Sequence, residues 1–397
     1  MSNILLISAV FPPEPVVSAR LSADIAGFLS EKYQVTVLCP PPSRPSGFIF
    51  KRTTNKSAYK LIYTESFTCP ESKLTGRLKE SYSFGRAAAR YIRANANEID
   101  CIYANVWPLL SQYMIVKAAK KIRVPCLLHV QDIYPESLTY KMNPFTGNAI
   151  NFFVRMLDKR TIQLATKVAG ISDKMITYLV NSRKVDSEKF FLIRNWQDDS
   201  MFLHIQQKPK KERDEFVFMF VGSLSPTAAL PSLIKAFHKA ALSKARLIIA
   251  GAGAEKEVCL KLVEELNQKQ IDFISVSPES VPVVQLEADV LLLSLKKNIA
   301  YTATPSKLTA YLLSAKAVLA CVEADTDTAE IISNASCGLV ANPEDTDSIA
   351  NLMQLFYRMP TAEIRQMGVR ARTYALQYMT KDVNLSKLSK EIEKLTV

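Results

Sequence analysis

Short runs of consecutive apolar residues alternate along the chain with longer segments in which apolar residues recur every three or four positions. The short runs suit strands buried on both faces of a parallel sheet, and the longer segments suit helices that cover such a sheet. The segment with Leu21, Ile25 and Leu29 on one helical face predicts a helix between two strands. In the first half the predicted strands are Ile4–Ser8, Val35–Cys39, Ile99–Tyr103, Cys126–Val130, Lys167–Ile171 and Phe190–Ile193.

The same rhythm restarts after the polar, charged segment 206–215, which indicates a linker. We therefore expect an α/β fold with two Rossmann-like domains facing a central cleft, residues 1–205 and 206–377. The helical segment Thr361–Val397 is longer than one domain needs, so a C-terminal helix at about 378–397 is expected to cross back to the first domain. The predicted strands of the second domain are Phe216–Val221, Arg246–Ala250, Ile271–Ser275, Val290–Leu293, Val318–Cys321 and Gly338–Val340.

Length and composition support two globular domains. The 397 residues exceed the ~250–300 at which a single core usually stops growing. No apolar run approaches the ~18–20 residues that span a bilayer, and the N-terminal segment lacks the features of a signal peptide, so we expect a cytoplasmic protein. Seven cysteines without metal-ligand spacing predict neither disulfides nor a zinc site.

The net charge of +12 is concentrated in the first half. Residues 1–200 hold 27 Lys and Arg against 16 Asp and Glu, a net charge of +11, which leaves +1 for the remainder. The first domain is therefore expected to meet an anionic surface.

Gly251 and Gly253 follow a predicted strand in a Gly-x-Gly pattern that resembles a dinucleotide-binding fingerprint. Lys256 stands where the third glycine of that fingerprint belongs, which disfavours a nucleotide-dependent dehydrogenase or epimerase. The two glycines permit close approach of a ligand to the backbone, and an ordinary tight turn explains them equally well.

The segment Thr304-Pro305-Ser306-Lys307 opens a predicted helix behind the strand Val290–Leu293. Thr304 suits the N-cap position and Pro305 the first helical position, so free backbone N–H groups and the helix dipole would attract a phosphate. Ser306 adds a hydroxyl and Lys307 a positive charge that would stabilise a leaving diphosphate. A capped helix with a solvated lysine is the alternative.

Several blocks along nearly the whole chain resemble, in order, the retaining GT-B glycosyltransferases of family 4, in particular the bacterial branch that builds capsule, O-antigen and exopolysaccharide. These blocks are Phe11–Pro15, Asp132–Ser137, Gly170–Asp173, Arg194–Asp198, Phe220–Leu224, Ile249–Gly253, Pro305–Lys307, Ala329–Ile332 and Cys337–Val340.

The resemblance implies a first domain that binds the acceptor and a second that binds a nucleotide diphosphate sugar, with no metal and no cofactor. The activity implied is transfer of a sugar, with retention, to a lipid-linked or saccharide acceptor. By position, Gly222 and Ser223 would lie near the donor phosphates, Lys307 would contact the diphosphate, and Glu330 would bind ribose or sugar hydroxyls. For Glu330, a favourable place in the first turn of a helix is the alternative.

The chain departs from this family pattern at several positions. Ala310 stands where the Pro-Ser-Lys-x-x-Glu-Tyr helix has its acid, and Ser223–Leu230 lacks the basic pair that many relatives carry. Loss of a nucleotide contact motivates a second hypothesis, a catalytically weak partner subunit of a glycosyltransferase.

On the acceptor side, His129 and Asp132 stand at the end of a buried run, where a sheet delivers side chains to a ligand. An imidazole can take a hydroxyl proton near neutral pH, and Asp132 would orient the acceptor or hold His129 by a hydrogen bond. A buried structural histidine is the alternative. Pro13, Glu14 and Glu136 are the further candidates for acceptor binding.

Arg86, Arg90 and Arg93 share one face of a predicted helix, which suits a helix lying on an anionic membrane at ~1 kcal/mol per basic residue. A solvated basic face is the alternative. No nucleic-acid-binding motif accompanies the charge, so nucleic acid is not expected as a partner. The protein is expected at the inner face of the cytoplasmic membrane, bound peripherally.

Overall fold

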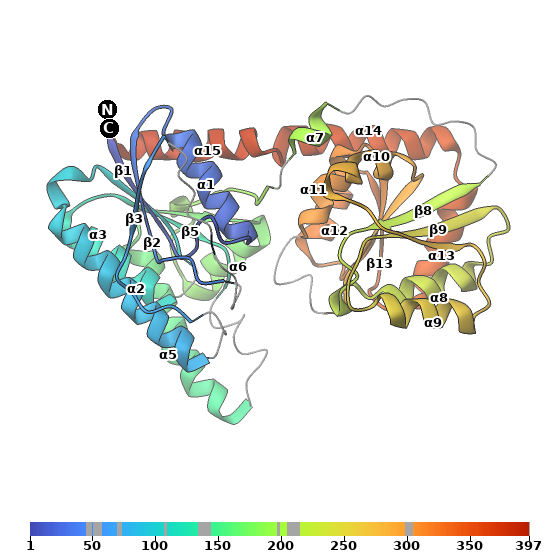
Figure 1. Ribbon diagram of the computed structural model, residues 1–397, viewed down its shortest axis with the longest axis horizontal. Coiled ribbons are helices and arrows are strands. Elements are labelled where there is room, and N and C mark those ends of the chain that lie inside the picture. Colours follow the sequence, from blue (N-terminus) through green and yellow to red (C-terminus); the bar gives the residue numbers. More distant parts are fainter. Residues whose placement is uncertain are drawn as a thin grey trace. The chain divides into compact units, whose positions relative to one another are not determined.

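The computed structural model describes residues 1–44, 50, 58–69, 74–106, 109–133, 144–196, 199–204, 215–297 and 305–396. The chain divides into two compact units, each built on its own sheet (Figure 1). Unit 1 comprises Met1–Asn195 and Asn384–Val397, and unit 2 comprises Trp196–Val383. Among the described residues, no helix is long and apolar enough to cross a membrane.

Unit 1 has a seven-stranded sheet in the order β3-β2-β1-β4-β5-β6-β7, and the paired strands run parallel. The edge strand β3 was not predicted, because its residues are mostly exposed and lack the apolar run of a buried strand. The strands are β1 (Asn3–Ser8), β2 (Gln34–Cys39), β3 (Lys60–Tyr63), β4 (Cys101–Asn105), β5 (Cys126–Val130), β6 (Lys167–Gly170) and β7 (Phe190–Leu192).

One face of this sheet is covered by four helices that share an apolar cluster with alternate strand residues such as Leu5, Ile7 and Leu128. The four are α2 (Leu74–Ala94), α3 (Leu109–Ile122), α5 (Pro144–Leu164) and α6 (Asp173–Arg183). Helices α1 (Val17–Leu29) and α15 (Lys381–Thr396) bury apolar residues outside this cluster, as expected for helices on the second face.

Unit 2 has a six-stranded parallel sheet in the order β10-β9-β8-β11-β12-β13. The strands are β8 (Phe216–Val221), β9 (Ala245–Ala250), β10 (Ile271–Ile274), β11 (Val290–Ser294), β12 (Ala317–Cys321) and β13 (Gly338–Ala341). The helices are α7 (Ser200–Leu203), α8 (Leu230–Ala240), α9 (Lys256–Glu265), α10 (Val281–Leu286), α11 (Ser306–Leu313), α12 (Asp327–Asn334), α13 (Thr346–Arg358) and α14 (Thr361–Tyr378).

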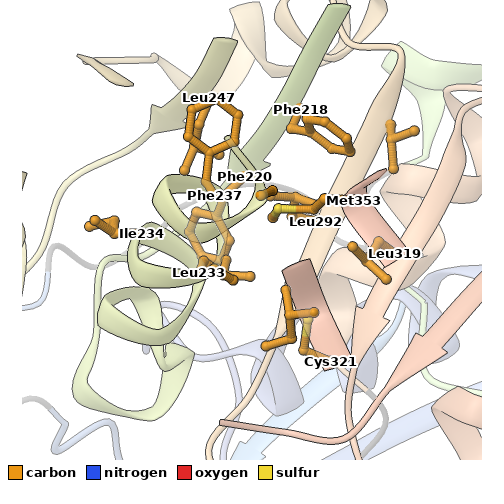
Figure 2. Packing of buried hydrophobic residues seen from close by; sticks show 14 of the residues in the cluster. Phe218, Phe220, Leu233, Ile234, Phe237, Leu247, Leu292, Leu319, Cys321 and Met353 are labelled. Atoms are coloured by element: carbon orange, nitrogen blue, oxygen red, sulfur yellow. The ribbon is translucent and has the colours of Figure 1, made fainter. Parts of the chain in front are cut away.

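Successive residues of β8 enter two different cores, as the alternation of a strand requires. Phe218 and Phe220 pack with α8 and α13 (Figure 2). Met219 and Val221 pack on the other face with α11, α12 and α14. Apolar side chains on both faces explain why the strands of this unit are apolar at successive positions.

The unit boundaries differ from the expected domain boundaries at 205/206 and about 378. Residues 199–204 precede the polar segment but belong to unit 2. They are tied to α14 by Arg372, which donates hydrogen bonds to the carbonyl oxygens of Phe202 and Leu203 at 3.1 Å each. Helix α15 begins at Lys381 in unit 2 and continues from Asn384 in unit 1, so the chain returns to its first unit.

Candidate active site

The strand order of unit 2 reverses between β8 and β11, which are neighbours in the sheet but not in the chain. Connections leave this point toward opposite edges, and ligands of open α/β sheets bind at the carboxyl ends of the strands there. Gly222 directly follows β8, and Lys307 lies in the first turn of α11, the helix after β11. Gly222 and Lys307, two residues predicted to bind the sugar donor, therefore lie at the switch point.

The side chain of Lys307 lies against Gly222 and the end of β8. Its Nζ stands 4.1 Å from the centroid of the Phe220 ring. A Cβ built on Gly222 would lie 2.9 Å from Nζ, so a residue with a side chain at this position must displace the lysine. Burial lowers the pKa of Lys307 to about 8. The ammonium is thus a poorly hydrated charge, which an anion would stabilise.

Gly251 and Gly253 serve the packing of one loop against another. The loop after β9 runs beside the loop after β8, with Gly222 N bonded to Ala250 O and Leu224 N to Ala252 O, both at 2.9 Å. Both glycines have positive φ, and a Cβ on either would collide with the backbone of Gly222 or Leu224. The close packing of the two loops therefore explains both glycines as residues of a tight turn. The exposed Ser223 lies on the same pair of loops.

Tyr311 is a residue of the site to which the sequence analysis assigned no role. Its hydroxyl accepts a hydrogen bond from Val221 N at 2.9 Å and lies 3.0 Å from Val221 O and 3.3 Å from Leu292 O. The side chain is fully buried. It fastens α11 to the ends of β8 and β11, one helical turn after Lys307, and so positions that lysine. The Tyr in the Pro-Ser-Lys-x-x-x-Tyr pattern was the available signal.

The start of α11 differs by one residue from the expectation. The helix begins at Ser306, and Pro305 occupies the N-cap position rather than the first helical position. The reason is that the Pro305 carbonyl accepts the first bond of the helix, from Leu308 N at 3.0 Å. The proposed cap Thr304 and the side chain of Ser306 lie outside the described residues.

Ala310 is 5% exposed and packs in the apolar core of unit 2. Its methyl group contributes to apolar packing and cannot make the polar contact of the acid in the family pattern. The structure therefore offers no replacement for that acid at position 310.

Glu330 lies in the first turn of α12, whose N-cap Thr326 accepts a hydrogen bond from Ala329 N at 3.4 Å. Because α12 follows β12, the neighbour of β11, its start lies at the same edge of the sheet as that of α11. Glu330 is half-buried. This position suits both interpretations of Glu330, a favourable interaction with the helix dipole and binding of the hydroxyls of the donor.

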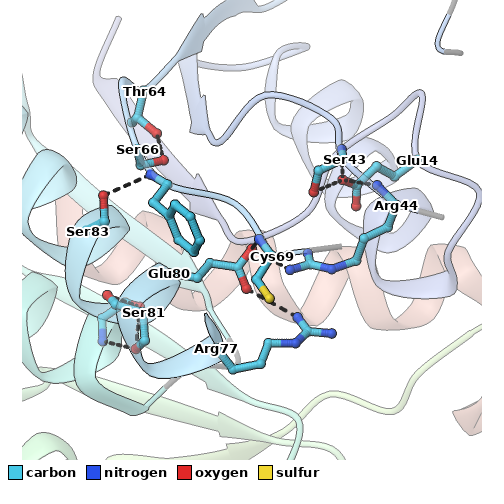
Figure 3. A network of polar contacts seen from close by, with 12 residues as sticks. Glu14, Ser43, Arg44, Thr64, Ser66, Cys69, Arg77, Glu80, Ser81 and Ser83 are labelled. Atoms are coloured by element: carbon cyan, nitrogen blue, oxygen red, sulfur yellow. Dashed lines mark hydrogen bonds and ion pairs between the residues drawn. The ribbon is translucent and has the colours of Figure 1, made fainter. Parts of the chain in front are cut away.

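In unit 1, Glu14 is buried and its carboxylate holds the loop after β2 (Figure 3). One oxygen accepts hydrogen bonds from Ser43 N at 2.6 Å and Arg44 N at 3.1 Å. The other oxygen, Oε2, is buried without a hydrogen-bond partner in the described chain. Pro13, which precedes Glu14, lies in the turn after β1 and is half-buried.

Glu80 on α2 ties three neighbouring segments together (Figure 3). Its carboxylate binds Arg44 at 2.5 Å, Arg77 at 3.3 Å and the amide of Cys69 at 3.1 Å. The loops after β2 and β3 are thereby fixed at the carboxyl edge of the sheet, beside Glu14.

His129 points into the interior rather than toward the edge of the sheet. It is 2% exposed, and its Nδ1 lies 2.6 Å from the hydroxyl of the fully buried Tyr103. Burial lowers the pKa of His129 to about 4, so the ring is neutral at pH 7. Nε2 is buried and has no hydrogen-bond partner among the described residues, Asp132 included, which corrects the expectation that Asp132 holds this ring by a hydrogen bond. The geometry favours the structural alternative for His129.

The end of β5 does present other polar groups. Asp132 is half-buried, and desolvation raises the pKa of its carboxyl. The amide of Asn195 donates to Gln131 Oε1 at 3.3 Å. Gln131 Nε2, a donor, and Asn195 Oδ1, an acceptor, are buried and have no hydrogen-bond partner within the part of the chain that the structure describes. Both side chains were missed as candidates, and Glu136 lies outside the described residues.

The predicted membrane-binding arginines and a surface hollow of unit 1 lie apart from these groups. Arg86, Arg90 and Arg93 are exposed on α2. A surface hollow of about 780 Å³ lies between β7 and α15 and contains none of the predicted site residues; it is lined by Phe191, Leu192, Lys387, Lys390, Glu391, Glu393 and Lys394.

Comparisons with known proteins agree with this organisation. The family model described as Glycosyltransferase Family 4 matches residues 19–200, and the model described as Glycosyl transferases group 1 matches residues 202–374. A comparison with curated protein sequences finds no significant match.

Solved structures resemble the whole chain at low sequence identity. HepE of Anabaena in complex with UDP has a TM-score of 0.69 at 15% identity, covering 99% of this chain and 100% of its own. A glycosyltransferase from Rickettsia africae has a TM-score of 0.70 at 13% identity, covering 99% and 98%. WaaG, a glycosyltransferase involved in lipopolysaccharide biosynthesis, has a TM-score of 0.63 at 14% identity, covering 98% and 99%. The chain therefore has the GT-B fold, and it consists of a Glycosyltransferase Family 4 domain followed by a Glycosyl transferases group 1 domain.

Proposed function

We propose that this glycosyltransferase moves a sugar, with retention of configuration, from a nucleotide diphosphate sugar to a lipid-linked saccharide during bacterial surface polysaccharide synthesis. The products in question are capsule, O-antigen or exopolysaccharide. The observation that carries the donor half of this proposal is the position of Lys307, a half-buried lysine with a lowered pKa, at the switch point of the group 1 domain.

Lys307 is proposed to bind the diphosphate and to stabilise it as a leaving group. As the bond between C1 of the sugar and the phosphate oxygen breaks, negative charge develops on that oxygen, and a preorganised cation lowers the barrier. The start of α11 adds helix-dipole stabilisation of the same sign. In the proposed reaction the acceptor oxygen bonds to C1 on the face that the diphosphate leaves, and the leaving phosphate takes the acceptor proton.

The sugar hydroxyls and the ribose are assigned to Glu330, whose carboxylate can accept two hydrogen bonds from a diol. Gly222, Ser223, Gly251 and Gly253 form the loops beside the diphosphate. HepE of Anabaena is described in complex with UDP-glucose. UDP-sugars are therefore the first donors to test.

Unit 1 is proposed to bind the saccharide of the acceptor. Support comes from three buried polar atoms at its carboxyl edge for which the described residues offer no hydrogen-bond partner, namely Glu14 Oε2, Gln131 Nε2 and Asn195 Oδ1. Leaving such atoms buried and unpaired is costly, and sugar hydroxyls can donate to or accept from each of them. Asp132 is proposed to orient the attacking hydroxyl.

The reaction is proposed to need neither metal nor cofactor and to take place at the cytoplasmic face of the membrane, to which the basic first unit binds. Lys307 supplies the charge that a divalent cation would otherwise bring to the diphosphate. Activity that EDTA abolishes and magnesium or manganese restores would contradict the metal-free proposal.

The test of the function is a screen of radiolabelled nucleotide sugars against bacterial lipid extracts. Transfer of label into the lipid phase is expected with one donor, and the coupling constant of the new anomeric proton then reports retention. Label that enters no acceptor and is not hydrolysed either would reject the enzymatic proposal.

Ala310 supports a second candidate, a catalytically weak partner subunit. In that case UDP would bind without turnover. Two measurements separate the candidates: calorimetry of UDP binding and the transfer assay. UDP binding without sugar transfer in any combination of donor and acceptor favours the partner subunit.

A further inference from the structure

The outward face of helices α2, α3 and α5 carries basic side chains without exposed acids. Helix α3 packs between α2 and α5 on one face of the unit 1 sheet. The exposed or half-buried basic residues of this three-helix face are Lys79, Arg86, Arg90, Arg93, Lys117, Lys120, Lys121, Arg155, Lys159 and Arg160.

The described carboxylates of these helices point inward. Glu80 of α2 is bound by Arg44 and Arg77, and Asp158 of α5 is buried against Arg183 at 2.7 Å. The basic charge of the three-helix face is therefore not balanced on the same helices. A surface of one sign over three helices is complementary to an extended anionic partner.

Helix α5 adds a cluster of exposed apolar side chains to this charge. Phe152 is 67% exposed, Phe153 is 64% exposed and Met156 is 53% exposed. Phe152, Met156 and Lys159 follow at i, i+4 and i+7 on the outward side of the helix, and Phe153 and Arg160 follow at i and i+7. Aromatic rings beside basic residues are the composition of a helix that lies in a membrane interface.

The aromatic pair is also placed near the acceptor edge. Helix α5 ends two residues before β6 begins, so its C-terminal end lies at the amino edge of the sheet. With 21 residues α5 is about 31 Å long, whereas β6 with 4 residues is about 13 Å long. Phe153 stands about 17 Å from the end of the helix and so at or beyond the carboxyl edge. Figure 1 shows α5 extending past the strands of its unit.

We propose that the three-helix face docks on an anionic phospholipid bilayer, with Phe152, Phe153 and Met156 inserted among the headgroups. This assignment rests on the proposed function, since it brings a lipid-linked saccharide to the edge of unit 1 that carries Glu14 and Asp132. It extends the sequence-based expectation, which considered the arginines of α2 and missed the apolar residues of α5.

Two measurements on the whole protein test the docking face. In co-sedimentation with mixed phosphatidylcholine–phosphatidylglycerol vesicles, F152S/F153S is expected to lower the partition coefficient at least about tenfold. The matched control V258S/L260S removes exposed apolar residues of α9 in unit 2 and is expected to bind like wild type. Vesicles of phosphatidylcholine alone should bind wild type weakly, and salt should weaken binding to the anionic vesicles.

The second measurement uses F152W and subtracts the emission of wild type, which already contains Trp107 and Trp196. The additional tryptophan emission is expected to shift to shorter wavelength and to be quenched by brominated lipids in the anionic vesicles. Equal partition of F152S/F153S and wild type, or an unquenched tryptophan, would overturn the proposal. So would a dimer in lipid-free sedimentation velocity that F152S/F153S dissociates, because the face would then bind a second copy of the chain.

The docking proposal and the proposed function fail separately. Vesicle binding needs no catalysis, and donor-sugar hydrolysis in solution needs no vesicle. Binding that depends on the aromatic pair without any transfer would reject the function alone. Transfer with vesicle binding unaffected by F152S/F153S would reject the docking face alone.

Discussion

The side chain of Lys307 occupies the space beside Gly222 in which a Cβ would stand, with its Nζ 2.9 Å from that position. The two residues are 85 positions apart in the chain and meet because β8 and β11 are neighbours at the switch point of the unit 2 sheet. Glycine at 222 thus leaves room for the Lys307 side chain beside the end of β8. Gly222 also has a φ of +148°, which side chains disfavour.

Replacing Lys307 with alanine is expected to lower kcat at least about tenfold, because the charge opposite the leaving diphosphate is lost. Steady-state kinetics with saturating donor measure this effect. The control is Lys235→Ala on the exposed surface of α8, which should leave kcat unchanged. Both variants should keep the melting temperature of wild type within a few degrees. A Lys307→Ala enzyme with wild-type kcat would remove the lysine from the mechanism.

The affinity for UDP is expected to fall as the pH rises above about 8, because burial lowers the pKa of Lys307 to about 8 in the free protein. A bound diphosphate raises that pKa again by favouring the charged form. Below about pH 8 the lysine is charged in both states and contributes no pH dependence. Between the two pKa values binding takes up a proton, and the affinity falls by up to about tenfold per pH unit.

Calorimetry of UDP binding at about pH 7 and about pH 9, in buffers of different ionisation enthalpy, measures this proton uptake. Lys307→Arg should abolish it, because an arginine stays charged over this range. Equal proton uptake by wild type and Lys307→Arg would assign the titration to another group.

Gly222→Ala is expected to weaken UDP binding by about tenfold or more, since the added methyl displaces the Lys307 ammonium. The control is Gly27→Ala on α1, where no atom lies within 4 Å of the added Cβ. That control should be neutral or more stable by up to about 1 kcal/mol, as expected for Gly to Ala within a helix. Unchanged UDP affinity in a folded Gly222→Ala protein would contradict the displacement.

Glu330→Ala is expected to raise the KM for the donor more than the KM for the acceptor, because the residue belongs to the group 1 domain. Glu330→Gln should recover part of the affinity, since an amide still accepts a hydroxyl hydrogen bond. Calorimetry with the nucleotide diphosphate alone then separates ribose from sugar contacts. An unchanged donor KM in Glu330→Ala would limit the residue to its interaction with the dipole of α12.

Tyr311→Phe is expected to destabilise unit 2 by ~1–3 kcal/mol, because the buried amide of Val221 loses its partner. Denaturant unfolding followed by circular dichroism measures the change, and Tyr82→Phe at an exposed position is the control. Since Tyr311 also positions Lys307, UDP affinity should fall at temperatures at which the variant is folded. Full UDP affinity together with lost stability would limit Tyr311 to a structural role.

The sequence determined most of the architecture because the apolar pattern that forms a parallel sheet is local. Phe216–Val221 was predicted with the bounds that β8 has, and the parallel two-sheet fold was confirmed. The edge strand β3 was not predicted from the sequence, because an exposed strand needs no apolar run. Lys307 was singled out by the local pattern that places it at a helix start.

Only the tertiary structure decided which of the candidate side chains point into a site. His129 and Asp132 are close in sequence, yet the alternation of β5 turns His129 into the core against Tyr103 and leaves Asp132 beyond the strand. Glu14 in the loop after β1 accepts hydrogen bonds from Ser43 and Arg44 in the loop after β2. Phe152 and Phe153 of α5 are exposed because α3 and the sheet pack against the other side of that helix. Burial and partner choice depend on contacts between distant segments, and a local sequence pattern does not contain those contacts.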